Sequence, residues 1–120
     1  MLRGLIVLAA LMLTAAPAHA QMEKCFKSAV STAEMRACQQ LGLAEVDARL
    51  NAAYRRAMAA LAPDRQEKLR RSERAWITFR DLDCDVHVGA DTGTLATIEV
   101  GSCLIDRREQ RIRDLAEFVD

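Results

Sequence analysis

The sequence predicts an all-α fold: an antiparallel helical hairpin plus a third, C-terminal helix, stapled by two disulfides. Apolar residues recur at three- and four-residue spacing, whereas no segment of useful length alternates apolar and polar residues as a strand does. Capping sequences mark where helices begin. Four cysteines supply cross-links for a core that must be built with only five aromatic residues.

The first twenty residues have the pattern of a secretion signal. Arg3 supplies a positive start, and Leu5 to Ala16 form an apolar run without a charge. Ala18-His19-Ala20 then gives the small-x-small pattern at which signal peptidase cuts. We therefore expect residues 1–20 to be removed, with Gln21 as the new first residue.

A membrane anchor is the alternative interpretation of this segment. Spanning a bilayer takes about 20 apolar residues, and Pro17 interrupts the run before it reaches that length. A lipid-anchored form would need a cysteine directly after the cleavage site, but the first cysteine is Cys25. The sequence thus predicts one helical domain over residues 22–120, periplasmic or secreted, with no membrane attachment after cleavage.

A capping box opens the first helix of the hairpin. The Ser31 hydroxyl caps the helix, while Glu34 reaches back to the start of the same turn. Gly42 either bends this helix or breaks it into two pieces. The apolar stripe that follows the cap has helical spacing and consists of Met35, Cys38, Val46, Leu50, Tyr54, Ala57 and Leu61.

A short turn at Ala62-Pro63-Asp64 separates the first helix from the second. Asp64 and Glu67 form a second capping box, and the second helix extends to about Val88. Two long helices joined by so short a turn fold back on each other as an antiparallel hairpin. One face of the second helix carries Leu69, Trp76, Phe79 and Asp83.

Residues 89–94 form a loop by their composition, and a last helix follows from about Ser102 to Phe118. Its inward face is predicted to carry Ile105, Ile112, Leu115 and Val119. Its solvent face is charged and carries Asp106, Arg107, Arg108, Glu109, Arg111 and Arg113.

The four cysteines are predicted to form two disulfides, because their number is even and the expected compartment is oxidising. A four-thiolate zinc site is the alternative, but the C-x-x-C spacing typical of such sites is absent. Sequence alone allows three pairings. We favour Cys25–Cys38 with Cys84–Cys103, since each closes a local segment, and Cys38–Cys84 with Cys25–Cys103 stays open.

In an antiparallel hairpin, Asp47 and Arg80 lie at similar distances from the turn, so the two residues come to about the same level along the helix axes. Both residues lie on or beside the apolar stripes, where either charge alone would be costly. We therefore predict a half-buried Asp47–Arg80 ion pair with a structural role, which fixes the register of the two helices.

Charge and histidine content exclude several functions. The chain has 17 basic and 17 acidic residues, and loss of Arg3 with the signal leaves a net charge of −1, so nucleic acid is not an expected partner. His87 is the only histidine outside the signal, and the cysteines are expected to be oxidised, which argues against metal sites and thiolate nucleophiles. We predict no catalytic residue, no metal and no cofactor, and hence no enzyme.

The unusual local feature is a cluster of carboxylates around Cys84, with no lysine or arginine between Arg80 and Arg107. A solvated helix end is one interpretation of this cluster. A docking patch for a basic partner is the other, because charge complementarity speeds encounter and aids specificity. We call this cluster the acidic end, and it comprises Asp81, Asp83, Asp85 and Asp91.

Two sets of motifs carry a family resemblance. The first is Cys25, Ser31-Thr32-Ala33-Glu34-Met35-x-x-Cys38 and Asp47-x-x-Leu50-Asn51-x-x-Tyr54. The second is Ala75-Trp76-x-x-Phe79-Arg80-Asp81-x-x-Cys84, Gly93-Thr94 and Cys103-Leu104. In this order they resemble the LprI-type lysozyme inhibitor domain, over about Cys25 to Leu115.

The resemblance implies an exported, disulfide-bonded helical domain, and some members of the family are taken to inhibit lysozyme. The chain departs from lipoprotein members because it lacks a lipobox cysteine, and Asp91-Thr92-Gly93 stands where relatives often carry paired glycines. Our hypothesis is a periplasmic protein that binds lysozyme through the loop after the second helix, where the acidic end lies, and blocks it without catalysis. The alternative is a structural or interaction protein of the cell envelope with an endogenous partner.

Overall fold

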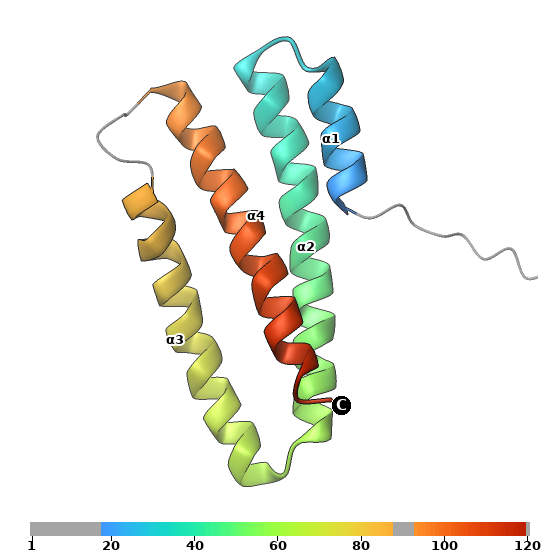
Figure 1. Ribbon diagram of the computed structural model, residues 1–120, viewed down its shortest axis with the longest axis vertical. Coiled ribbons are helices and arrows are strands. Elements are labelled where there is room, and N and C mark those ends of the chain that lie inside the picture. The colour runs from blue at the N-terminus through green and yellow to red at the C-terminus, as the bar shows by residue number, and fades with distance from the viewer. Residues whose placement is uncertain (1–17, 88–92, 120) are drawn as a thin grey trace, which may run out of the picture.

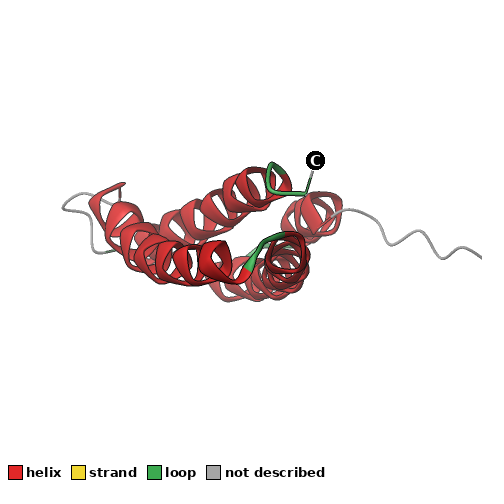
Figure 2. Cartoon of the chain, turned by 90° about the horizontal axis from the view of Figure 1, so that it is seen from below, coloured by secondary structure: helices red, strands yellow, loops and turns green. Residues whose placement is uncertain are grey.

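The computed structural model describes residues 18–87 and 93–119, and every regular element in these ranges is an α-helix. Figure 1 shows them along the chain, and the end view in Figure 2 shows helices joined by short connections. The all-α class is therefore confirmed. Most of the predicted signal (residues 1–17) lies outside the described residues. The helices are α1 (Ala18–Ser28), α2 (Thr32–Ala60), α3 (Pro63–His87) and α4 (Thr94–Ala116).

Helix α1 was not expected from the sequence, because its few residues are too short a stretch to show a clear period. A disulfide between Cys25 and Cys38, with 5.6 Å between the Cα atoms, ties it to α2. Met22 of α1 packs over Gly42 of α2, where an added Cβ would lie 2.8 Å from the Met22 sulfur. The glycine therefore does not break α2, which is one helix from Thr32 to Ala60, but lets α1 approach it closely.

The predicted capping box at the start of α2 is present. The Glu34 backbone N–H donates to the Ser31 hydroxyl at 3.2 Å. The Glu34 carboxylate in return accepts from the backbone N–H groups of Val30 at 2.7 Å and Ser31 at 3.0 Å. These bonds satisfy donors that the first turn of a helix leaves without a partner.

The turn from α2 to α3 is short, as predicted, but the second capping box is not formed. Helix α3 begins at Pro63, which places Asp64 inside the first turn rather than at the cap. Proline is favoured at a first helical position because its backbone has no N–H to satisfy. The Gln66 side chain closes the turn by donating to the Met58 carbonyl at 2.9 Å.

Helix α4 changes the arrangement expected for the hairpin. It runs between α2 and α3 in Figure 1, and the most extensive helix–helix contact is between α2 and α4, not between α2 and α3. The core confirms this order, because Leu115 of α4 is fully buried in it. The buried residues of that core are Leu50, Ala53, Ala57, Leu61, Leu69 and Leu115.

Both ends of α4 differ from the prediction. It begins at Thr94, eight positions before Ser102, and its last residues do not include Val119, which is 48% exposed. Within the added turns, Gly101 lies directly against α2, since a Cβ there would clash with the Gln39 side chain. Glycine usually weakens a helix, but here it allows α4 to lie directly against α2.

The face of α3 that was expected to be buried is only partly so. Leu69 and Cys84 are its buried residues, whereas Phe79 is 57% exposed. The prediction for Phe79 was wrong because α3 turns toward α4 rather than α2, which rotates the buried side of the helix. In the described ranges, no helix is both long enough and apolar enough to cross a membrane.

Candidate functional site

The end of α3 is fixed against α4 by the Cys84–Cys103 disulfide, with 5.7 Å between the Cα atoms. The favoured pairing of the cysteines is thereby confirmed, and no cysteine of the described residues is free. Cys84 is completely buried, so the bridge forms a rigid base under the surface around it. Three aspartates of the acidic end project from this part of α3, while Asp91 lies outside the described residues.

The three aspartates differ in how far their charge is neutralised. Asp81 pairs with Arg80 at 2.8 Å. Asp83 pairs with Arg107 of α4 at 2.6 Å. Asp85 is exposed, and it has no ion-pair partner among the residues described. The acidic end is therefore less negative than its sequence suggested, because the two arginines that flank it in the sequence reach back to it.

Helix α4 adds two carboxylates that the sequence did not assign to this region. Glu99 and Asp106 are both exposed, and they line a shallow hollow of about 410 Å³ beside the disulfide. We call it the end hollow, and it is lined by His87, Ile98, Glu99, Ser102, Cys103, Asp106 and Arg107. Glu99 and Asp106 could have been assigned to this region from the expected Cys84–Cys103 disulfide, because that bond brings the sequence neighbours of Cys103 close to α3.

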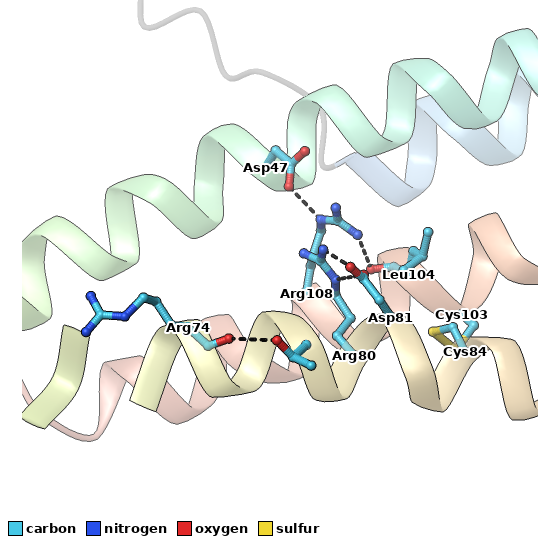
Figure 3. Close-up of polar contacts among 9 residues, drawn as sticks. Asp47, Arg74, Arg80, Asp81, Cys84, Cys103, Leu104 and Arg108 are labelled. Carbon is cyan, nitrogen blue, oxygen red and sulfur yellow. Dashed lines mark hydrogen bonds and ion pairs between the residues drawn. A yellow bond between two sulfur atoms is a disulfide. The ribbon is translucent and has the colours of Figure 1, made fainter. Parts of the chain in front are cut away.

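The predicted Asp47–Arg80 pair is not formed. Asp47 accepts a hydrogen bond at 2.5 Å from the Nε of Arg108, whose Nη1 donates to the Leu104 carbonyl at 2.9 Å. Figure 3 shows this guanidinium reaching Asp47 from α4, while Arg80 is bonded to Asp81. The prediction failed because α4 supplies the guanidinium that reaches Asp47.

Arg80 instead packs on an aromatic ring. Its guanidinium carbon lies 5.2 Å from the centre of the Trp76 ring, within the range of a cation–π contact. Asp47 and Arg80 still line the same groove between α2 and α3, whose volume is about 380 Å³. The two residues therefore lie near each other, as predicted, but they do not form an ion pair.

Two further ion pairs hold α4 in place. Arg49 of α2 forms a two-pronged pair with the carboxylate of Glu109, at 2.5 and 2.9 Å. The hydrogen bond to Glu109 raises the pKa of Arg49 above its ordinary value. Arg111 reaches Glu73 of α3 at 2.9 Å. Arginines and carboxylates of α4 therefore fix its register against both neighbouring helices.

The groups around the Cys84–Cys103 disulfide are poorly suited to binding a metal ion. Ligand atoms of Asp83, Cys84 and Cys103 lie within 4.8 Å of one another, but both sulfurs are in the disulfide and so cannot bind a metal as thiolates. The Arg107 guanidinium bonds Asp83 and lies 3.3 Å from the Nε2 of His87. A cation at this position would be repelled by Arg107.

Comparison with known proteins adds the following. A family model described as lysozyme inhibitor LprI matches residues 23–115 of the chain. An uncharacterized protein of Rhizobium meliloti (strain 1021) is 30% identical over 128 aligned positions, which cover 94% of this chain and 92% of that protein. No solved structure gives a significant match.

Proposed function

Because the chain belongs to the LprI family of lysozyme inhibitors, we propose that it is an exported protein that binds lysozyme and blocks it without catalysis. The observation that carries the proposal is the family match, which begins within α1, ends near the end of α4 and includes both disulfides. The predicted motifs on which the resemblance depends lie within the same residues.

Two features support export. The segment before Gln21 has the charge, apolar run and small residues of a cleavable signal. Both disulfides join residues after that point, and such bonds persist in oxidising compartments. A periplasmic or extracellular location is also where a protein would meet lysozyme.

The acidic end, together with the end hollow, is the surface that we propose for docking. Lysozymes of animal type are strongly basic and hold two catalytic carboxylates in a cleft. Asp85, Glu99 and Asp106 are exposed carboxylates that could face the basic rim of that cleft. The Cys84–Cys103 disulfide ties α3 to α4 beside this surface, which would reduce the conformational entropy lost on binding. Occupying the rim would close the cleft to substrate without any reaction.

The proposal is tested with residues 21–120, oxidised and purified, titrated into a lysozyme assay that follows the clearing of a bacterial suspension. We expect clearing to slow with increasing protein and to be restored by added lysozyme. A sample with both disulfides reduced and alkylated is the matched control and should inhibit less. Undiminished clearing at a large excess of the oxidised protein would refute inhibition.

A further inference from the structure

The outward face of α3 carries an apolar stripe that no other described helix covers. The stripe consists of Ala75, Phe79, Leu82 and Val86, all exposed, with exposed fractions of 57%, 62% and 78% for the last three. A solvated helix face would normally carry polar residues at these positions. Large apolar side chains in a row on a charged helix indicate a surface that another molecule covers.

The spacing of the stripe is that of a helix-packing seam. Its members are separated by four, three and four residues, which is the a/d repeat of a coiled coil. A seam of this spacing presents a straight row of side chains to a second helix, rather than a patch suited to a flat surface.

Charges beside the stripe indicate which helix would fit. Arg71 and Asp85 stand two heptads apart at equivalent flanking positions of the repeat. Both side chains are exposed, and neither has an ion-pair partner among the described residues. Residues 63–74 of α3 carry a net positive charge, whereas residues 75–87 carry a net negative one. In an antiparallel pair of α3 helices, the basic half of each helix would therefore lie against the acidic half of the other.

We propose that α3 packs against α3 of a second copy of the chain, antiparallel across a two-fold axis. In this arrangement Arg71 lies opposite Asp85 of the partner subunit, and symmetry forms that pair twice. Phe79 packs beside Ala75 of the partner subunit, so a large side chain faces a small one. A parallel arrangement would instead place the basic half of one helix against the basic half of the other, and like charges beside a helix seam repel.

The dimer does not depend on the proposed lysozyme function. Glu99 and Asp106 belong to α4, and neither is part of the apolar stripe. The two surfaces share only Asp85. An association measurement on the protein alone therefore tests the dimer, whatever the outcome of the lysozyme assay.

The first test is sedimentation of oxidised residues 21–120 over a wide concentration range. We expect a monomer–dimer equilibrium that Phe79→Asn abolishes, because Phe79 faces Ala75 of the partner subunit. Leu41→Asn is the matched control, because Leu41 is 66% exposed on α2 and lies outside the stripe. Circular dichroism is used to check that both variants are folded. A wild-type protein that stays monomeric, or a dimer that survives Phe79→Asn, would overturn the proposal.

Charge exchange tests the antiparallel register. Arg71→Asp and Asp85→Arg should each weaken self-association about fivefold, because each sets like charges opposite one another twice. Mixed in equal amounts, the two variants should form a heterodimer with both pairs restored, and the double variant should again associate with itself. A mixture that associates no better than either single variant would rule out this pairing.

Discussion

Arg108 is buried between α2 and α4, where its guanidinium bonds both Asp47 and the carbonyl of Leu104. Its side chain is only 10% exposed, while that of Asp47 is 49% exposed. The arginine therefore depends on the pair for its hydrogen bonds more than the aspartate does. Arg80, which pairs with an exposed neighbour on its own helix, cannot hold two helices together in this way.

A double-mutant cycle distinguishes the two arginines. We expect the cycle of Asp47→Asn with Arg108→Met to give a coupling of about 1 kcal/mol, as for a hydrogen bond to a charged group that is partly open to water. The cycle of Asp47→Asn with Arg80→Met should give a coupling near zero, because these side chains share a groove but no bond. Urea unfolding measures both. A larger coupling to Arg80 would restore the pair predicted from the sequence.

Glu34 gives the start of α2 a dependence on pH. Hydrogen bonds from the backbone N–H of Val30, and next from that of Ser31, lower the pKa of this carboxyl below its ordinary value of 4.5. The charged form is thus favoured in the folded protein. Its contribution to stability is present above the pKa of the unfolded chain and is lost as the pH falls through the folded pKa.

The matched variant for Glu34 is Glu34→Gln, which keeps an oxygen that accepts hydrogen bonds but has no charge. We expect wild type to exceed it in free energy of unfolding at neutral pH, and the difference to shrink as the pH falls below 4.5. Unfolding at a series of pH values measures this. A difference that stays constant with pH would mean that the charge of Glu34 does not stabilise the cap.

At the scale of the elements, Gly101 shows how two helices come close. The Gln39 side chain fills the space over this glycine and donates from Nε2 to the Ile98 carbonyl at 2.6 Å. The Gln39 residue is 4% exposed, so its amide cannot turn to water without moving the helices. This contact positions the first turns of α4, which carry Glu99 of the end hollow.

Gly101→Ala is therefore expected to destabilise the protein, although alanine is the better helix former by about 1 kcal/mol. The added methyl displaces Gln39 and leaves a buried polar group without its partner, at a cost of about 1–3 kcal/mol. Adding Gln39→Ala should recover most of the loss, because it removes both the clash and the amide. Thermal unfolding of the two single variants and the double variant tests this. A double variant no more stable than Gly101→Ala would contradict it.

The elements were predictable to the extent that local patterns specify them. The Ser31 cap, the break at Pro63 and the local cysteine pairs could be inferred because each depends on residues close in the sequence. The order of the helices could not be inferred, because the apolar pattern of a helix shows which face is buried but not which other helix covers that face. Phe79 and Asp47 were misassigned for that reason. The role of Gly101 could not be predicted either, because it depends on contact with Gln39, which is distant in the sequence.

At the scale of the whole molecule, charge is distributed unevenly while the total is close to neutral. The exposed carboxylates near the Cys84–Cys103 bridge come from both α3 and α4, whereas the first half of α3 is basic. The sequence predicted the three aspartates of α3 because they lie within five consecutive positions of the chain. It did not predict the contribution of Glu99 and Asp106, because this depends on how α3 and α4 meet.

Charge reversal on α4 tests whether this distribution directs binding to lysozyme. Asp106 and Glu117 are both exposed on or just after α4, but only Asp106 lines the end hollow. Asp106→Lys should weaken inhibition about fivefold, the equivalent of about 1 kcal/mol for a charge at the rim of an interface, and more at low salt. Glu117→Lys makes the same change in net charge and should leave inhibition unchanged. Equal effects of the two variants would mean that total charge alone matters.

The two disulfides each join cysteines that are consecutive in the sequence. A chain exported with its N-terminus first would expose Cys25 and Cys38 to the oxidant before either of the other two cysteines emerges. The first bond can then form while no incorrect partner is present, and the second pair meets only each other. Maturation on this route needs a thiol oxidant but no isomerase to exchange mispaired bonds.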